Sequence, residues 1–231
     1  MKKRINKLVD ITLDCCYSRF KFLRPDPKNY STIVGVGSVV PVQIEAYFLA
    51  LNKYVDEGAK ILDVGFGLGY GLNILSIKAR DVYGVDVDEK VLNHCKNTIV
   101  GRNPRLNFLE IFDGYNLPFA DNSFDILTAV DVIEHVEDYN RLITEMMRVT
   151  RKGVFLSTPN RRIENTNPDG TPKNYWHLRE WNFKEFFEII KKFGPIEWNF
   201  INGSFEGPFS ISDKINENTQ ALSPFIFKHP K

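Results

Sequence analysis

The sequence predicts an α/β protein with a Rossmann-like three-layer arrangement, in which helices cover both faces of a mostly parallel sheet. Three observations predict this fold class. Short apolar segments alternate with amphipathic segments from residue 60 onward, a glycine-rich turn follows the first of them, and acidic residues follow four of them in succession. Alternation at this spacing is typical of parallel βαβ units. The length of 231 residues suits one domain of this type.

Composition excludes several other classes of protein. Apolar residues make up 43% of the chain and charged residues 26%, which suits a sizeable core and not a disordered chain. The formal charge is only +1, whereas proteins that hold nucleic acid through its phosphates usually have a clear basic excess. Cys15, Cys16 and Cys95 form no C-x-x-C pair and no disulfide framework, and Cys95 is expected in the core. No apolar run is long enough to span a bilayer, so we expect a cytoplasmic protein without membrane contact.

Residues 1–57 are expected to form a helical N-terminal extension. Apolar residues recur at helical spacing within 5–12 and again within 42–55, and the second helix ends near Gly58. The alternating pattern then begins. The expected strands are 61–64, 82–87, 106–111, 124–130 and 154–157, and the expected helices are one through Leu72, Leu75 and Ala79, one that opens at Asp88, and 137–149.

Residues 161–231 are expected to form a loop, a helix and closing strands within the same single domain. Asn182 and Glu185 have the spacing of a capping box. The helix that they open is expected to turn inward the side chains of Phe183, Phe186, Phe187 and Ile190. Residues 197–201 and 224–228 are the expected closing strands, and the polar connection 202–223 is expected to be a loop that becomes ordered with a partner or substrate.

The first strand leads into the segment Asp63-Val64-Gly65-Phe66-Gly67-Leu68-Gly69. Glycines at alternate positions let the backbone turn sharply and approach a ligand without an intervening Cβ, although a tight strand-to-helix turn alone would need them too. A dinucleotide-binding loop requires G-x-G-x-x-G, but Tyr70 stands three positions after Gly67. Because Asp63 directly precedes the loop, a cationic ligand suits it better than a phosphate.

Acidic residues also follow the next three strands. In an open parallel sheet, ligands bind beyond the carboxyl ends of the strands. Asp86 there can accept bonds from both hydroxyls of a ribose, although it could instead cap a helix, a role open to Asp88. Asp113, before Gly114, suits an adenine amino group, and Asp131 opens the segment that ends in Glu134-His135. Any one acid could be a turn residue, but four at successive strand ends indicate a ligand site.

Together these segments resemble the class I S-adenosylmethionine-dependent methyltransferases, from about Lys60 to Asn160. The matching features are 63–69, Asp86, Leu117-Pro118-Phe119-Ala120-Asp121-Asn122-Ser123-Phe124-Asp125, Ile133-Glu134-His135-Val136, Arg148-Val149 and Ser157-Thr158-Pro159-Asn160. The resemblance implies a seven-stranded sheet whose last strand is antiparallel, with residues 58–160 as the cofactor-binding core. Two departures are Arg151-Lys152-Gly153, where many relatives have a longer Pro-Gly-Gly turn, and Phe66, where many have cysteine.

The resemblance also implies which residues bind S-adenosylmethionine. The loop 63–69 is assigned to the methionine part, Asp86 to the ribose and Asp113 to the adenine, while Asp131 lies close to the cofactor. The full expected set is Asp63, Gly65, Phe66, Gly67, Gly69, Asp86, Val87, Asp113, Gly114 and Asp131.

Methyl transfer depends mainly on holding nucleophile, methyl and sulfur in line, and it needs a base only when the acceptor is protonated. His177 and His135 are the candidate bases, and Glu180 is expected to orient His177 or bind a second hydroxyl. The segment 174–181 mixes aromatic and ionisable side chains and is expected to cover the open end of the sheet. The alternative is that its aromatic residues fill the core. Similar Asn-x-x-His-x-x-Glu segments occur in family members linked to glycan and small-molecule methylation.

The leading hypothesis is therefore a methyltransferase that acts on an oxygen of a small molecule or saccharide. One alternative is an RNA or protein methyltransferase, which a basic patch around Arg161, Arg162 and Lys173 would favour; another is a non-catalytic module that only binds the cofactor. The Asn-Pro-Pro-aromatic motif of amine-methylating enzymes is absent. A metal-assisted catechol-type site would need Asp-Asn where Pro159-Asn160 stands, so no metal is expected.

Overall fold

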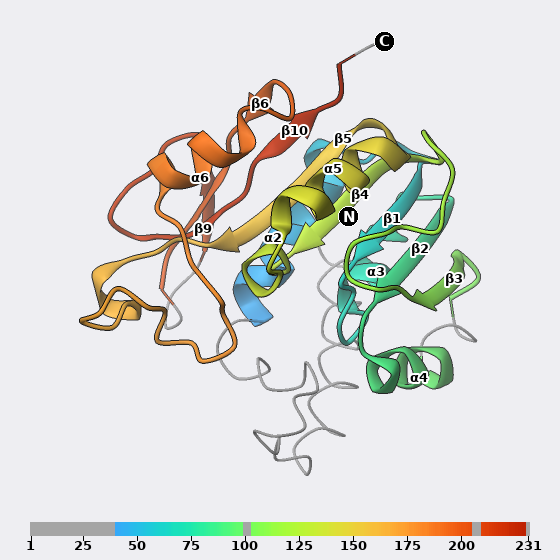
Figure 1. Cartoon of the computed structure of the whole chain (residues 1–231). Helices are drawn as coiled ribbons and strands as arrows, with labels where there is room; N and C mark the ends of the chain where they lie inside the picture. The colour runs from blue at the N-terminus through green and yellow to red at the C-terminus, as the bar shows by residue number, and fades with distance from the viewer. Residues whose placement is uncertain (1–39, 99–102, 205–208, 230–231) are drawn as a thin grey trace. The chain divides into compact units, whose positions relative to one another are not determined.

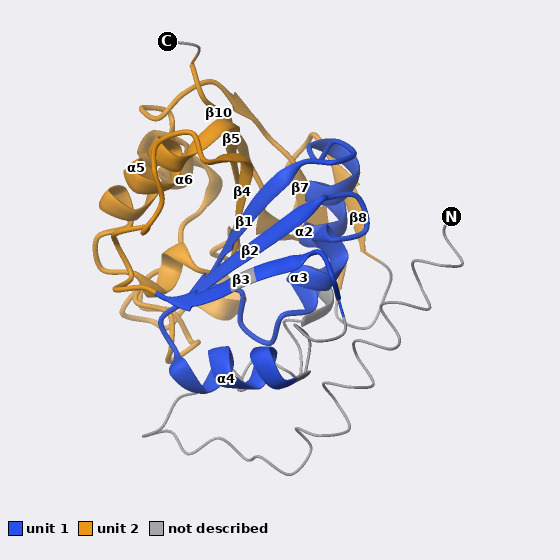
Figure 2. Cartoon of the chain, turned by 90° about the vertical axis from the view of Figure 1, so that its right-hand side faces the viewer, with its two compact units in different colours: residues 1–111 blue, residues 112–231 orange. Residues whose placement is uncertain are grey.

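The computed structural model describes residues 40–98, 103–204 and 209–229 (Figure 1). The expected helical segment 5–12, Cys15 and Cys16 lie outside these residues. The chain divides into two compact units, one up to Ile111 and the other from Phe112 (Figure 2). Among the helices of the described ranges, none combines the length and the apolar character that crossing a membrane requires.

The first unit contains a three-stranded parallel sheet with the order β3-β2-β1. Its elements are α2 (Val40–Lys53), β1 (Lys60–Val64), α3 (Tyr70–Leu75), β2 (Asp81–Asp86), α4 (Glu89–Thr98) and β3 (Leu106–Ile111). The sequence predicts all six, with shifts at the ends; α3 ends before Ala79, for example. Asp88 caps α4 as expected, because its Oδ1 accepts a hydrogen bond of 2.8 Å from the backbone N–H of Lys90. Cys95 is fully buried, which confirms its place in the core.

Two glycines allow close packing in this unit. A Cβ on Gly84 in β2 would lie 2.7 Å from Cδ1 of Phe66, and a Cβ on Gly71 in α3 would lie 2.2 Å from Cζ of Tyr47 in α2. Both separations are far below van der Waals contact, and interiors packed this tightly do not adjust freely. Each glycine therefore makes room for an aromatic ring that comes from another part of the unit.

The second unit joins two parallel strands to a set of antiparallel ones. Its elements are β4 (Phe124–Val130), the 3-10 turn η3 (Ile133–His135), α5 (Tyr139–Val149), β5 (Thr150–Pro159), the 3-10 turn η4 (Ile163–Asn165), α6 (Phe183–Ile190), β6 (Ile196–Glu197), β7 (Phe200–Asn202), β8 (Ser210–Ser212), β9 (Thr219–Leu222) and β10 (Phe225–Phe227). Strand β5 pairs in parallel with β4 and antiparallel with β9 and β10. The C-terminal strands thus confirm the expected antiparallel end of the sheet.

The expected number of seven strands is wrong, because the described residues form ten. The segment expected as one strand, 197–201, is divided between β6 and β7. The segment expected as a loop, 202–223, contains β8 and β9. These strands have only three and four residues, too few to show a period of two. Strand β8 pairs with the preceding strand β7, whereas β9 pairs with β7 and with β5, which is distant in sequence.

Helix α6 begins as predicted. Asn182 Oδ1 accepts from the N–H of Glu185, and Glu185 Oε2 accepts from the N–H of Asn182, both at 3.1 Å. The inward direction of Phe187 is wrong, since this residue is 38% exposed while Phe186 is fully buried. Adjacent residues on a helix point about 100° apart, so these two side chains cannot both face the core.

Candidate functional site

The glycine loop of the first unit requires its glycines. Gly65, Gly67 and Gly69 have φ angles of 70°, 51° and 78°, all in the left-handed region that other L-residues seldom adopt. The N–H of Gly69 donates to the carbonyl of Phe66 over 2.9 Å, which closes the turn before α3. The alternate glycines are thus explained by backbone conformation at each position.

Asp86, at the end of β2, supports this loop directly. It is 3% exposed; its Oδ2 accepts from the N–H of Gly67 over 2.9 Å, and its Oδ1 accepts from the N–H of Asp88 over 3.0 Å. Burial raises the pKa of the Asp86 carboxyl, although these backbone N–H groups oppose the rise. Val87 beside it is 62% exposed. Asp86 is therefore a buried acceptor at the edge of the loop, while Asp88 caps the helix.

Asp63 is fully buried at the end of β1, and the sequence does not show what holds it there. The hydroxyl of Tyr47 contacts both carboxylate oxygens, at 3.2 Å from Oδ1 and 3.0 Å from Oδ2. In the sequence, Tyr47 is only one of the apolar positions within the expected helix 42–55. The one local signal is Gly71, whose missing side chain leaves room for the Tyr47 ring.

The side chain of Phe66 is 2% exposed and lies against Gly84 of β2. It belongs to the hydrophobic core of the first unit. The phenylalanine that stands where many relatives have cysteine therefore affects packing there. Any role of Phe66 in binding a ligand would fall to its backbone.

In the second unit, Asp113 and Asp131 have different surroundings. Asp113 is exposed, and its Oδ1 accepts from the N–H groups of Tyr115 at 2.8 Å and Asn116 at 2.6 Å. These bonds hold the pKa of the Asp113 carboxyl below its usual value. Gly114 has a φ of 87°, and Asp131 has a φ of 52°, which is uncommon for a residue other than glycine. Sparsely populated backbone conformations of this kind concentrate at functional sites.

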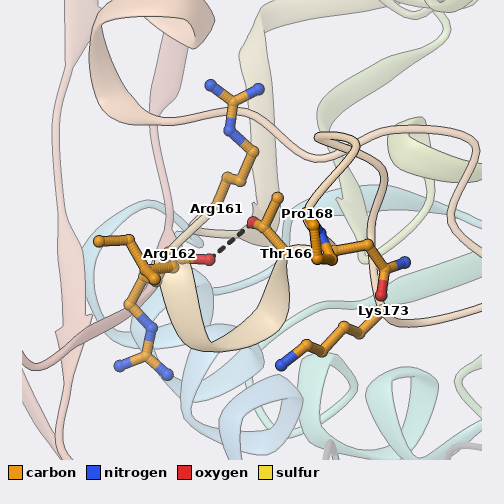
Figure 3. A pocket seen from close by; sticks show the side chains of 7 residues that line it. Arg161, Arg162, Thr166, Pro168 and Lys173 are labelled. Atoms are coloured by element: carbon orange, nitrogen blue, oxygen red, sulfur yellow. Dashed lines mark hydrogen bonds between the residues drawn. The ribbon is translucent and has the colours of Figure 1, made fainter.

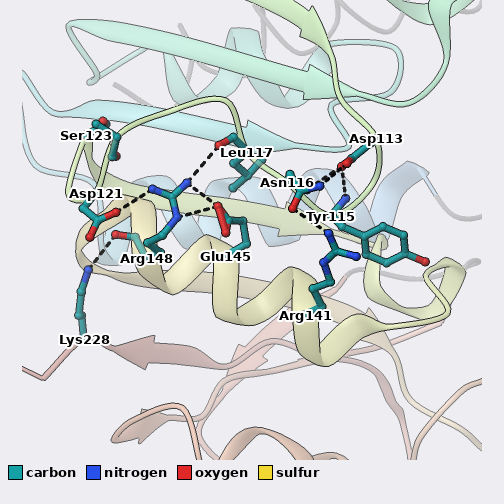
Figure 4. A network of polar contacts seen from close by, with 11 residues as sticks. Asp113, Tyr115, Asn116, Leu117, Asp121, Ser123, Arg141, Glu145, Arg148 and Lys228 are labelled. Carbon is teal, nitrogen blue, oxygen red and sulfur yellow. Dashed lines mark hydrogen bonds and ion pairs between the residues drawn. The ribbon is translucent and has the colours of Figure 1, made fainter.

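A polar network ties the segment after Asp113 to α5 (Figure 4). Arg141 donates to Asn116 Oδ1 over 2.8 Å. Arg148 donates to Asp121 Oδ1 over 2.8 Å and to the carbonyl of Leu117 over 3.1 Å. The segment 117–125 and Arg148, two matching features of the family resemblance, are therefore physically connected.

Two acids and two histidines of the second unit form a polar cluster. Glu134 is fully buried and Glu180 is 5% exposed. The imidazole rings of His135 and His177 meet edge to face, with ring centres 4.8 Å apart. One oxygen of Glu134 accepts from the hydroxyl of Thr158 over 3.1 Å, while its Oε1 has no hydrogen-bond partner.

The hydrogen bonds fix the orientation of both imidazoles. His135 Nδ1 lies 2.8 Å from the carbonyl oxygen of Trp176, which can only accept, so Nδ1 carries the proton. His177 Nδ1 lies 2.7 Å from Glu180 Oε1 and donates to it. His177 Nε2 then accepts from the amide of Asn174 at 2.9 Å. The Nε2 atom of each ring therefore carries the lone pair.

The charges in this cluster are strongly perturbed. Burial raises the pKa of Glu134 well above its usual value, and the carboxylates of Asp131 and Glu180 raise it further. Burial and the neighbouring His177 lower the pKa of His135 to about 4, so His135 is neutral at pH 7. Perturbed groups gathered in one place are typical of functional sites.

The side chains of the segment 174–181 differ in their exposure. Tyr175 is 83% exposed and Leu178 51% exposed. Trp181 is 6% exposed and stacks on Phe186, with ring centres 5.5 Å apart. The end of the segment fills the core, and its beginning presents side chains to solvent.

The basic residues after β5 line a cavity of about 600 Å³ (Figure 3). The lining residues are Arg161, Arg162, Ile163, Thr166, Asn167, Pro168 and Lys173. Their charge is partly compensated, because Arg161 lies 2.5 Å from Glu185 and Arg162 lies 3.0 Å from Glu164. The cavity therefore brings together the three basic residues that the sequence suggests as a patch.

Comparisons with known proteins show what the chain is similar to. Residues 62–158 match the family model described as a methyltransferase domain. A probable S-adenosylmethionine-dependent methyltransferase of Mycobacterium tuberculosis is 31% identical over 186 residues, with 77% of this chain and 65% of the relative covered. Norajmaline N-methyltransferase of Rauvolfia serpentina is 29% identical over 161 residues, with 62% and 53% covered. The chain thus spans less than two thirds of the length of these curated relatives.

A solved methyltransferase structure has a similar fold. An S-adenosylmethionine-dependent methyltransferase from Aquifex aeolicus superimposes with a TM-score of 0.62 at 16% identity, over 89% of this chain and 100% of the other. At this identity the likeness shows the fold alone, a mixed α/β Rossmann-like one. With the matched domain it leads to one conclusion: the chain resembles the class I S-adenosylmethionine-dependent methyltransferases, both in the sequence of residues 62–158 and in its fold.

Proposed function

We propose that the protein transfers the methyl group of S-adenosylmethionine to an oxygen atom of a small molecule or saccharide. The observation that carries the first half is the loop of three left-handed glycines held by the buried carboxylate of Asp86. A cluster of oriented histidines and buried acids on the second unit supports the second half, because such groups can remove a proton from a hydroxyl.

The cofactor contacts in this proposal follow the family resemblance. Each oxygen of Asp86 already accepts one backbone N–H, and a carboxylate has about four acceptor sites, so two remain for the ribose hydroxyls. The loop from Asp63 to Gly69 is assigned to the methionine part, with Phe66 acting through its backbone. Val87 accompanies the ribose, Asp113 and Gly114 the adenine, and Asp131 is expected close to the cofactor.

The methyl transfer itself is an in-line displacement. A lone pair of the acceptor oxygen forms a bond to the methyl carbon while the carbon–sulfur bond breaks. The electron pair of the broken carbon–sulfur bond stays on sulfur, which becomes a neutral thioether. The proton of the acceptor hydroxyl passes to His177 Nε2, whose ring is oriented by the bond from Nδ1 to Glu180. The amide of Asn174 must first leave Nε2, and His135 is the reserve base.

Calorimetry on the purified chain tests the cofactor. S-adenosylmethionine and its demethylated product should bind, and NAD should not. Asp86→Ala should weaken binding by about 1.5–3 kcal/mol, or about 10- to 150-fold, the range for hydrogen bonds to a charged group. Asp88→Ala is the matched control, because it removes the cap of α4 and should lower stability more than cofactor affinity. Binding of NAD alone would overturn the proposal.

Turnover tests the acceptor. Saccharides, phenols and amines are screened with labelled cofactor, and the histidine variants are assayed on the best substrate. His177→Ala should lower turnover by about 10²–10⁴-fold with cofactor affinity nearly unchanged. Loss in His135→Ala alone would move the base to His135. Transfer only to amines, as the name of the Rauvolfia relative suggests for that protein, would contradict the oxygen acceptor. Cofactor binding without any transfer would favour a non-catalytic module.

The second candidate function is methylation of RNA, favoured by the basic cavity of Arg161, Arg162 and Lys173. The ion pairs to Glu185 and Glu164 and the formal charge of +1 weigh against it. Oligonucleotides belong in the same screen. This candidate would be favoured by RNA binding that weakens with added salt and whose affinity is lower in Lys173→Gln than in the wild type.

A further inference from the structure

Glu134, His135 and His177 lie together in a way that suits a metal ion. Each of the three offers one ligand atom, and these atoms all lie within 4.8 Å of one another. All three residues belong to the second unit: Glu134 and His135 follow β4, and His177 comes from the segment after β5. We propose that these three side chains bind a divalent transition-metal ion.

The unsatisfied oxygen of Glu134 is the strongest sign of a missing partner. Glu134 is fully buried and its Oε1 accepts no hydrogen bond, while Oε2 is held by Thr158. Oε2 of the neighbouring Glu180 is buried and unsatisfied as well. Buried polar atoms are nearly always paired, and an unpaired one requires an explanation such as an ion. Among the described residues, no lysine or arginine forms an ion pair with either acid. A cation beside Glu134 would give Oε1 the partner that it lacks.

Both imidazoles are oriented as metal-binding histidines are. A ligating histidine usually donates its other ring N–H to a carboxylate or a backbone carbonyl, which fixes the ring and makes it a better donor. His135 donates Nδ1–H to the carbonyl of Trp176, and His177 donates Nδ1–H to Glu180. In each ring, Nε2 is left with the lone pair.

Binding requires only local movement. Donor atoms around a tetrahedral ion with bonds of about 2.1 Å are about 3.4 Å apart, so the widest separation in the cluster must shrink by about an ångström. The amide of Asn174, which donates to His177 Nε2 over 2.9 Å, must rotate away. Asn174 thus occupies, in this structure, the lone pair that the ion would use.

The donor set indicates the class of ion. Two imidazole nitrogens with one carboxylate suit Zn²⁺, Co²⁺, Fe²⁺ or Mn²⁺, whereas Mg²⁺ and Ca²⁺ prefer oxygen ligands alone. From the sequence we expect no metal, on the ground that a catechol-type site would need Asp-Asn where Pro159-Asn160 stands. The proposed site departs from that expectation, because it uses different residues at a different strand end.

The role of the ion, unlike its binding, rests on the proposed function. With three protein ligands, positions remain for an acceptor hydroxyl. A bound ion lowers the pKa of a coordinated water or hydroxyl by many units. The hydroxyl would lose its proton to water and attack the methyl carbon as an alkoxide. Since His177 Nε2 cannot bind metal and accept a proton together, a loaded site would relieve His177 of its role as a base.

Binding is tested first without cofactor or acceptor, on the full chain with its affinity tag removed and its metals stripped by a chelator. Titration with Co²⁺ should show one equivalent bound, with visible ligand-field absorption. Zn²⁺ should displace Co²⁺, and Mg²⁺ at the same concentration should not. Absence of stoichiometric Co²⁺ binding by the folded wild-type chain would overturn the proposal.

Variants then locate the site. Glu134→Gln, His135→Gln and His177→Gln should each weaken Co²⁺ binding by about 10²-fold or more, and Glu180→Gln by about 10- to 100-fold through its support of His177. His229→Gln is the matched control, because His229 is exposed and outside the cluster, and its affinity should equal that of the wild type. Circular dichroism checks that each variant is folded. If the variant of one ligand residue fails to fold, alanine variants of the two other ligand residues are measured in its place. Unchanged affinity in the folded variants would refute the site.

The two proposals fail separately. Specific Co²⁺ binding without methyl transfer to any hydroxyl would leave the metal site standing and refute the oxygen acceptor. Methyl transfer in wild-type protein that binds no metal would refute the metal site and leave His177 as the base.

Discussion

Tyr47→Phe is the perturbation that most directly tests how the first unit holds its buried acid. The hydroxyl of Tyr47 lies 3.2 and 3.0 Å from the two oxygens of Asp63, and both residues are almost fully buried. The substitution removes the hydroxyl and keeps the ring, which packs edge to face with Tyr70 at 5.8 Å and fills the space left by Gly71. A change in stability therefore reports the hydrogen bond and not a cavity.

The expected loss follows from the charge of the acceptor. A hydrogen bond to a charged group contributes about 1.5–3 kcal/mol, roughly twice a neutral one. The full benefit requires a buried and well-oriented pair, and Asp63 is fully buried. We expect Tyr47→Phe to lower the free energy of unfolding by about 2 kcal/mol.

Urea denaturation of the full chain, followed by circular dichroism, measures this loss. Tyr175→Phe is the control, because Tyr175 is 83% exposed and its change should stay within about 0.5 kcal/mol. Asp63→Asn and the double variant complete a thermodynamic cycle, which should show a coupling energy above about 0.5 kcal/mol. Equal stability of Tyr47→Phe and wild type, or no coupling to Asp63, would refute the reasoning.

Three further results are expected from the packing, the charges and the network. Gly71→Ala should destabilise the chain by at least about 1–3 kcal/mol in urea, because its Cβ would lie 2.2 Å from Cζ of Tyr47; an unchanged midpoint would contradict the close packing. Burial raises the pKa of Asp86 in the folded chain above its ordinary value of 3.8. As pH rises, the unfolded chain therefore releases this proton before the folded chain does. The free energy of unfolding should fall as pH rises from about 3.8 through the folded pKa. Urea midpoints compared with Asp86→Asn across that range should isolate this fall, and a parallel pH dependence in the two proteins would contradict it. Arg148→Met should cost about 1 kcal/mol, mainly through the bond to the carbonyl of Leu117, since its partly exposed ion pairs to Asp121 and Glu145 contribute less; equal urea midpoints would show that this bond adds nothing.

The sequence by itself predicts the order of the elements and the glycine loop. Both depend on interactions between residues close in the chain. Alternating apolar segments need only local periodicity, and left-handed backbone at Gly65, Gly67 and Gly69 needs only the absent side chains. The capping roles of Asp88 and Asn182 are local for the same reason, because a cap bonds to backbone two or three residues away.

Contacts between distant residues were decided by the tertiary structure. Tyr47 reaches Asp63 across 16 positions, and His135 meets the carbonyl of Trp176 across 41. No periodicity encodes such pairs. The sequence predicts His135 and His177 as separate candidates, and only folding brings His177 to Glu134 and His135, with one oxygen of Glu134 unsatisfied. Strand β9 likewise depends on the distant strand β5, since a segment of four residues carries too little pattern to define a strand without the neighbour that pairs with it.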